Sequence, residues 1–246
     1  MNPIIEVKNL RFKYGVNSTY VLNSINMKIE KNTITAIAGL SGCGKSTLAF
    51  ALCGAIPKSI PGIMDGIILL EEKDINELSL SSLAKKIGIV FQEVDNQLFL
   101  PTVEAEIAFA SENLCLSYDE IDEIVNRILK ELNIEHLRYK DPSSLSGGEK
   151  HLVAIASVLS MNPEIIILDE VMSQLDEKNK GLISDTIDIL RKSGKTIILI
   201  DHDIENLMMA DYIYLMKDGK IEAIVEGDVD DEFLYNQLTN FFLSQI

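Results

Sequence analysis

Two segments near the start of the chain alternate apolar and polar residues, one over residues 5–10 and one over residues 25–29. Because successive side chains of a β-strand point to opposite faces, this alternation predicts half-buried strands of an antiparallel sheet. Other segments are apolar at nearly every position, which is typical of central strands covered on both faces. They span residues 33–40, 87–91, 164–169 and 196–201. Buried strands separated by helical stretches predict a mainly parallel α/β sheet.

The segment between about residues 95 and 162 has no strand-like run, and its apolar residues recur at helical spacing. Its clearest helix is expected over residues 119–132, where the apolar positions fall on one face. Ser117 and Glu120 are spaced as a capping box just before that helix. This segment is therefore predicted to be a helical insertion in the α/β sheet.

The length and the apolar content favour one domain. With 246 residues, 47% of them apolar, the chain can bury a large core. After residue 201 we expect a short helix, a hairpin of strands over 212–216 and 221–225, and a terminal helix. The predicted domain covers residues 1–246, with a core over about 1–94 and 163–246 and a helical lobe over about 95–162.

Charge and apolar runs limit where the chain acts. The 38 acidic and 22 basic residues give a formal charge of −16, which repels nucleic-acid phosphates and anionic lipids, so no nucleic-acid partner is expected. No run reaches the roughly 20 apolar residues of a membrane-spanning helix. The start of the chain lacks a secretory pattern, which predicts a cytosolic location. The scattered cysteines Cys43, Cys53 and Cys115 are predicted to be free thiols.

A glycine-rich loop follows the buried strand expected over residues 33–40. It matches the Walker A pattern, in which backbone amides and a helix N-terminus surround the phosphates of ATP. Lys45 would reach the β- and γ-phosphate oxygens, and Ser46 would bind Mg²⁺. The predicted ATP-binding residues here are Gly39, Ser41, Gly42, Cys43, Gly44, Lys45, Ser46 and Thr47. The alternative is a tight strand-to-helix turn with an exposed lysine.

Two carboxylates stand at the end of the strand expected over residues 164–169. Asp169 would bind Mg²⁺ through water, and Glu170 would orient or deprotonate the water that attacks ATP. By itself, such a pair is also compatible with a solvated strand terminus.

A second helix start, at Ser146, Gly147, Gly148 and Glu149, carries the features of an anion site. Its glycines allow close backbone approach, and the helix dipole would face a phosphate. Ser146 and Glu149 also fit a simple capping box. The position ahead of the Asp-Glu strand and on the helical segment resembles the LSGGQ signature of ABC ATPases, and this resemblance extends over essentially the whole chain.

The resemblance implies the ABC ATPase fold, which is a RecA-like P-loop core with an N-terminal antiparallel β region and an inserted helical lobe. It also implies roles for four further residues. Tyr14 is placed like the aromatic residue that stacks on adenine, although an ordinary edge-strand aromatic is the alternative. Gln92 resembles the Q-loop glutamine, which contacts Mg²⁺ or the attacking water. Residues 173–176, with Asp176, resemble the D-loop.

His202 matches the switch histidine that hydrogen-bonds the γ-phosphate, while a solvated loop histidine is the alternative. The catalytic residues expected from the resemblance are Lys45, Gln92, Glu170 and His202, and the Mg²⁺ ligands are Ser46, Gln92 and Asp169. In this family ATP is bound between two cassettes. Ser146, Gly147, Gly148 and Glu149 would therefore act on the partner subunit's ATP, in a homodimer or a heterodimer.

Residues 90–92 and 95–99 are similar to the ATPase subunits of energy-coupling-factor (ECF) transporters and the related cobalt/nickel importers. The resemblance implies uptake of a vitamin or a transition-metal ion. It also implies a transmembrane coupling subunit, a substrate-binding membrane component and a peripheral place on the cytoplasmic face of the membrane. A docking groove is expected at Glu93, Val94, Asp95, Asn96, Leu98 and Phe99, with Glu104 and Glu106 close by.

Some positions depart from the family pattern. Glu149 stands in place of the usual Gln, Leu152 in place of a frequent Arg, and Val171 with Met172 in place of Pro-Thr. Cys43 lies beside Lys45 at a helix N-terminus, a setting that favours the thiolate, although it also fits as a small filler of a variable position.

Two other functions are less consistent with the sequence. A soluble ABC protein acting on nucleic acid or ribosomes usually has two cassettes or basic insertions, and neither is visible here. A GTPase-like switch would need an Asn-Lys-x-Asp motif, which is missing. The sequence does not identify the transported solute.

Overall fold

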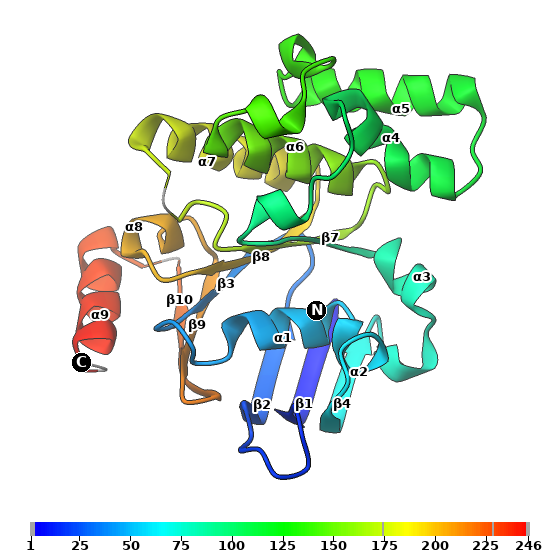
Figure 1. The fold of residues 1–246 in the computed structure, drawn as a ribbon. Coiled ribbons are helices and arrows are strands. Elements are labelled where there is room, and N and C mark those ends of the chain that lie inside the picture. Colours follow the sequence, from blue (N-terminus) through cyan, green and yellow to red (C-terminus); the bar gives the residue numbers. More distant parts are fainter. Residues whose placement is uncertain (1–2, 174, 228, 245–246) are drawn as a thin grey trace.

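The computed structural model describes residues 3–173, 175–227 and 229–244 and contains two β-sheets (Figure 1). The smaller sheet has the order β2-β1-β4-β5 and is antiparallel throughout. Its strands are β1 (Ile5–Lys13), β2 (Leu22–Ile29), β4 (Ile63–Leu70) and β5 (Lys73–Asp74). The two half-buried strands predicted from alternation are thus confirmed. Their apolar side chains face the molecule's interior, and the polar ones face solvent.

The larger sheet forms the centre of the molecule, with the strand order β10-β9-β3-β8-β7-β6. All neighbouring strands are parallel except β9 and β10, which form the expected hairpin. The strands are β3 (Ile34–Ala38), β6 (Ile87–Val90), β7 (Ile165–Asp169), β8 (Thr196–Asp201), β9 (Tyr212–Lys217) and β10 (Lys220–Glu226). Every residue of β3, β7 and β8 is buried, as their continuous apolar runs predict.

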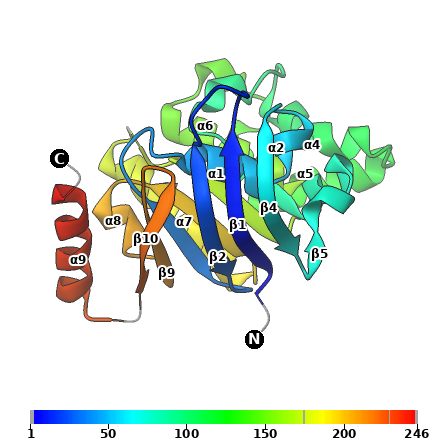
Figure 2. The same cartoon turned by 90° about the horizontal axis from the view of Figure 1, so that it is seen from below.

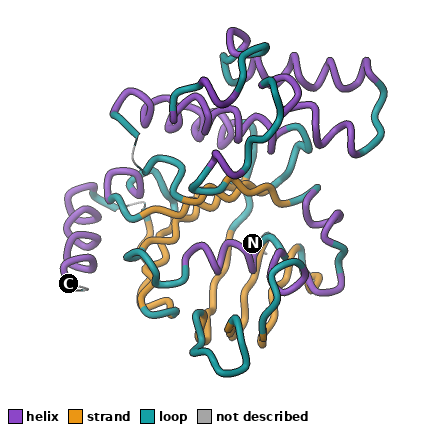
Figure 3. The backbone as a smooth tube through the Cα atoms, viewed as in Figure 1, coloured by secondary structure: helices purple, strands orange, loops and turns teal. Residues whose placement is uncertain are grey.

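Helices cover both faces of the larger sheet. Figure 3 shows one helix, α1 (Lys45–Leu52), between the two groups of strands, while α6 (Gly147–Leu159) and α7 (Glu177–Lys192) lie across the opposite face. Because side chains alternate along a strand, β7 sends Ile165 and Ile167 into the cluster with α1, and Ile166 and Leu168 into the cluster with α6 and α7. The larger sheet therefore separates two hydrophobic cores.

The helical segment lies between β6 and β7, and no strand is described within it. It contains α4 (Val103–Asn113), α5 (Tyr118–Glu131) and α6, with the short 3-10 turns η2 (Val94–Asn96), η3 (Glu135–Leu137) and η4 (Pro142–Ser144). The capping box of Ser117 and Glu120 is formed at the start of α5. The exact boundaries of the lobe, near residues 95 and 162, stay a prediction.

The remaining elements connect and flank the sheets. They are α2 (Ala55–Lys58), η1 (Ile75–Glu77), α3 (Leu80–Ala84), α8 (Ile204–Leu207) and the terminal helix α9 (Asp231–Leu243). Figure 2 shows α9 at the side of the β9–β10 hairpin, away from the antiparallel sheet. No helix within the described ranges has the length and apolar character needed to cross a bilayer.

Sequence reasoning missed β4, because an Asp-Gly pair interrupts its apolar run like a turn. The structure gives a tertiary reason for this pair. Gly66 adopts a φ of +94° opposite an irregularity in β1, and a Cβ atom there would lie 2.5 Å from the carbonyl oxygen of Asn9. Only pairing with β1 makes this segment a strand.

Candidate active site

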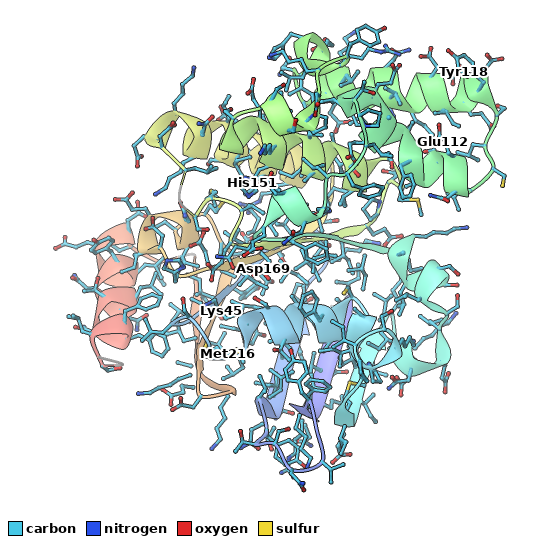
Figure 4. All side chains as sticks on the ribbon, viewed as in Figure 1. Lys45, Glu112, Tyr118, His151, Asp169 and Met216 are labelled. Carbon is cyan, nitrogen blue, oxygen red and sulfur yellow. The ribbon has the colours of Figure 1, made fainter. Side chains whose placement is uncertain are left out.

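The glycine-rich loop folds back around the first residue of α1. Lys45 is only 4% exposed, and its Nζ donates hydrogen bonds to the carbonyl oxygens of Gly39 at 2.8 Å and Leu40 at 3.2 Å. The loop lines a cavity of about 210 Å³ together with Gln92 and Glu170. Figure 4 shows Lys45 below Asp169, with Met216 further below. The lysine is buried with its charge directed toward the loop, which contradicts the alternative of an exposed lysine.

The β9–β10 hairpin passes directly behind this loop. A Cβ atom on Gly39 would lie 2.2 Å from the carbonyl oxygen of Met216, so only glycine fits at that position. The turn of the hairpin also contacts the loop, because the backbone N–H of Gly219 donates to the carbonyl oxygen of Cys43 at 3.0 Å. The hairpin therefore fixes the path of the phosphate-binding loop from outside.

Asp169 ends β7 and is only 3% exposed, and its Oδ1 has no hydrogen-bond partner among the described residues. Burial raises the pKa of Asp169, while a hydrogen bond with Ser46 acts in the opposite direction. A buried carboxylate oxygen without a partner, next to a hydroxyl, suits Mg²⁺, which prefers oxygen ligands. Ser46 and Asp169 thus fit the magnesium ion that was predicted from the sequence.

Glu170 is the point on which the predicted catalytic side chains converge. Its Oε1 lies 3.3 Å from Lys45 Nζ, and its Oε2 accepts a hydrogen bond from Gln92 Nε2 at 3.1 Å. His202 Nδ1 lies 3.6 Å from the same Oε2 atom. These residues come from α1, the loop after β6, the end of β7 and the end of β8. The parallel sheet brings them together because its strands end at one edge.

The backbone of Glu170 has a φ of +51°, in the left-handed region that is unusual for a residue with a side chain. Its N–H donates to the carbonyl oxygen of Ile200 at 2.9 Å, and its own carbonyl oxygen accepts from the Ser173 hydroxyl at 2.8 Å. These bonds hold the conformation, which directs the carboxylate toward Lys45.

Tyr14 lies next to the phosphate loop. Its hydroxyl is 2.9 Å from Thr47 Oγ1, and its ring packs edge-on against Phe12 at a centroid distance of 4.9 Å. The side chain is 48% exposed. Its stacking on adenine stays a prediction.

The signature residues lie outside the cavity around Lys45. Ser146 and Glu149 line a separate cavity of about 480 Å³ with Asp176 and Asn179. The capping box stated as the alternative is formed: the Ser146 hydroxyl accepts a hydrogen bond from the N–H of Glu149 at 3.4 Å, and the Glu149 carboxylate accepts from the N–H of Ser146 at 2.9 Å. These hydrogen bonds lower the pKa of Glu149, because they stabilise its charged form.

Close packing against Asn179 explains why glycine is needed at position 148, the second glycine of the signature. A Cβ atom on Gly148 would lie 2.4 Å from Asn179 Oδ1. Asp176 caps α7 through the N–H of Asn179 at 2.8 Å. Gln174, within the predicted D-loop, lies outside the described residues.

Three of the departures from the family pattern, Leu152, Val171 and Met172, are buried apolar residues. Val171 is fully buried, and Met172 and Leu152 are at most 5% exposed.

The expectation that Cys43 favours the thiolate is wrong, because burial raises the pKa of Cys43 and outweighs the opposing effect of Lys45. Cys43 instead acts as a small, half-buried residue of the loop.

Sequence reasoning gave no role to Gln97, although it lies in the subfamily motif. Its side chain accepts from the N–H of Phe91 at 3.1 Å and donates to the carbonyl oxygen of Ile89 at 3.2 Å. These two bonds fix the end of β6 and the start of the loop that carries Gln92. His151 was also missed. It is buried, with Nδ1 2.9 Å from the carbonyl oxygen of Gly147.

The fold and this constellation define a P-loop ATPase. A protein-family model described as "ABC transporter" matches residues 22–173. The chain is 40% identical to the energy-coupling factor transporter ATP-binding protein EcfA of Pediococcus pentosaceus over 226 residues, which are 90% of this chain and 78% of that protein. The chain therefore belongs to the ABC transporter ATP-binding family and is an ABC ATPase.

Solved structures of ABC ATPases also match this chain. CbiO1 of Clostridium perfringens, described as part of the ABC transporter complex cbiONQ, matches with a TM-score of 0.85 and 35% identity, over 97% of this chain and 93% of that one. The ATP-binding cassette MJ0796, solved as a post-hydrolysis dimer bound to ADP and Pi, matches with a TM-score of 0.77 and 28% identity. That match covers 92% of this chain and all of the other. The predicted fold class is confirmed.

Proposed function

We propose that this chain is the ATP-hydrolysing subunit of an ECF-type importer for a vitamin or a transition-metal ion. The observation that carries the proposal is the convergence of Lys45, Gln92 and His202 on the buried carboxylate of Glu170. The names of the relatives EcfA and CbiO1 support the importer class.

The proposed reaction uses these side chains in distinct roles. Lys45 and the amides of its loop bind the phosphates, and Glu170 takes a proton from the attacking water. Gln92 and His202 orient that water and contact the γ-phosphate. Mg²⁺, held by Ser46, Gln92 and Asp169, would neutralise phosphate charge when bound. The buried setting of Glu170 strengthens these electrostatic effects.

The second half of the site is proposed to come from another cassette. Ser146 and Glu149 line a cavity apart from Lys45, so one chain does not bring its signature loop to its own phosphate site. The dimeric structure of the related cassette MJ0796 supports this arrangement. ATP would then lie between the Lys45 loop of one chain and the Ser146 loop of the other.

A membrane subunit is proposed to dock beside the loop that follows β6. Glu93, Val94, Asp95 and Asn96 line a cavity of about 380 Å³ there, and the exposed ring of Phe99 packs edge-on against Phe109. Phe99 would provide an apolar anchor. Asp95 is paired with Lys150 at 2.6 Å, but its side chain is still 76% exposed and would attract a basic residue.

The two carboxylates expected close to the docking groove make contacts within the chain. Glu106 is 2% exposed and accepts hydrogen bonds from the backbone N–H groups of Phe99 and Leu100. Glu104 pairs with Arg138 at 2.5 Å. The charges of these two carboxylates are therefore already used to hold this loop and helix α4.

The decisive test is the identity of the proteins that purify with the tagged chain from detergent-solubilised membranes. Mass spectrometry should find a second ABC ATPase subunit or further copies of this chain, a transmembrane coupling subunit and a small substrate-binding membrane protein. Such recovery would also support a peripheral place on the cytoplasmic face of the membrane. Recovery with ribosomes or nucleic acid would instead favour the alternative, an ABC ATPase that is not engaged in transport.

A further inference from the structure

The ring of His202 makes no hydrogen bond of its own with any residue that the structure describes. Its Nδ1 lies 3.6 Å from Glu170 Oε2 and 3.9 Å from Asp201 Oδ1, and its side chain is 45% exposed. Both distances exceed those of protein hydrogen bonds. The direction of the ring toward Glu170 therefore depends on the backbone that carries it.

Asp201, which precedes His202 in the chain, holds that backbone through its buried carboxylate. Its Oδ1 accepts hydrogen bonds from the N–H groups of His202 at 2.7 Å and Asp203 at 2.9 Å. Its Oδ2 accepts from Asn206 Nδ2 at 2.9 Å. The Asp201 side chain is fully buried, so this anchor belongs to the sheet and its surroundings.

Asp203, which follows His202 in the chain, connects the backbone on that side to helix α7. Its Oδ2 lies 2.9 Å from Lys180 Nζ in α7, and its Oδ1 accepts from the N–H of Glu205 at the start of α8. Lys180 stands in the first turn of α7, where its N–H donates to the carbonyl oxygen of Asp176 at 2.9 Å. The ion pair thus joins the predicted D-loop region to the loop of His202.

The pair lies in the catalytic surroundings. Lys180 and Asp203 line a cavity of about 310 Å³ with Glu170, Gln92 and His202. The Lys180 side chain is only 20% exposed. The hydrogen bond with Asp203 raises the pKa of Lys180, while burial acts in the opposite direction, so the ammonium form is favoured there.

We propose that Lys180 is a positioning residue for ATP hydrolysis, whose ion pair with Asp203 holds the loop that directs His202 toward Glu170. This inference rests on the proposed catalytic role of His202. Because Asp176 caps α7 and accepts the N–H of Lys180, a contact of the partner subunit with the D-loop would be transmitted to His202 through the Lys180–Asp203 pair.

The test measures kcat, the KM for ATP and the melting temperature in the purified, ATPase-active assembly. Lys180→Gln and Asp203→Asn should each lower kcat by about tenfold, the effect of losing one charged hydrogen bond. KM and melting temperature should match those of the control Lys192→Gln, which removes an exposed lysine from the end of the same helix. Lys180→Arg should restore most of the rate, and the double variant should be no slower than either single one.

Several results would overturn the proposal. They are a kcat of Lys180→Gln within about twofold of the control, additive losses in the double variant, or a fall in rate matched by a higher KM or a lower melting temperature. The variant His202→Ala distinguishes a failure of the catalytic role of His202 from a failure of the positioning role of Lys180. If this variant hydrolyses ATP at the wild-type rate, the proposed catalytic role of His202 fails as well. If it is inactive while Lys180→Gln is not, only the positioning role fails.

Discussion

The ammonium group of Lys45 lies 3.3 Å from Glu170 Oε1, and both residues are more than nine-tenths buried. The lysine is proposed to bind phosphate, and the carboxylate is proposed to activate water. A carboxylate so close to the lysine competes with the phosphates of ATP for the same positive charge. Glu170 therefore opposes ATP binding at the same site at which it would promote hydrolysis.

Replacing Glu170 with Gln should separate these two effects. We expect the rate of hydrolysis to fall by about 10² to 10⁴, because the general base is lost. The affinity for ATP should be retained or increased, because the competing charge is lost. Phosphate release and calorimetric ATP binding would measure the two quantities. Glu164→Gln, at the opposite end of β7, is the matched control. Hydrolysis by Glu170→Gln at the wild-type rate would show that another group is the base.

The predicted magnesium site should depend on pH through Asp169. Its carboxyl must lose a proton to bind Mg²⁺, and burial raises its pKa. Binding of Mg²⁺ should therefore weaken, as the pH falls, at a higher pH than for an ordinary aspartate. Asp169→Asn should lower the metal affinity by about 10- to 100-fold and remove this pH dependence. Titrations with Mn²⁺, followed by electron paramagnetic resonance in the presence of ATP, would test both expectations.

Asp188→Asn provides the control for the metal titrations, because Asp188 is exposed on the outer side of α7. A wild-type metal affinity in Asp169→Asn would exclude Asp169 from the magnesium site.

Sharing of the site between two chains can be tested by complementation, if the chain pairs with itself. Lys45→Ala removes the phosphate-binding lysine, and Ser146→Arg fills the signature loop of the partner. Each variant alone should be inactive as a homodimer. A mixed dimer, purified through two different tags, should regain one intact site and about half of the wild-type activity, if sites act independently. No recovery in a proven mixed dimer would contradict the shared site.

The docking surface can be changed without altering the phosphate site. Asp95→Arg reverses an exposed charge that is paired with Lys150 at 2.6 Å, and Phe99→Ala removes the exposed ring. Together they should weaken assembly with the membrane subunit and substrate uptake, while the basal ATPase activity stays near normal. Asp119→Arg with Tyr118→Ala, exposed at the start of α5, is the matched control. Unchanged co-purification would place the docking surface elsewhere.

The sequence by itself determined the features that depend on neighbouring residues. The buried strands β3, β7 and β8 follow from continuous apolar runs, and α5 follows from its helical spacing and its capping box. The residues of the phosphate loop are contiguous, so their pattern is readable without a structure. A contiguous motif also placed Asp169 and Glu170 at the end of one strand.

Only the tertiary structure decided which distant groups support these motifs. The carbonyl oxygen of Met216 stands behind Gly39, β1 makes a strand of the segment around Gly66, and Lys180 meets Asp203 across two helices. Burial likewise raised the pKa of Cys43, contrary to the effect expected from its neighbours in sequence. The physical reason is that close packing, desolvation and ion pairing depend on distance in space, whereas a single sequence reports only order along the chain.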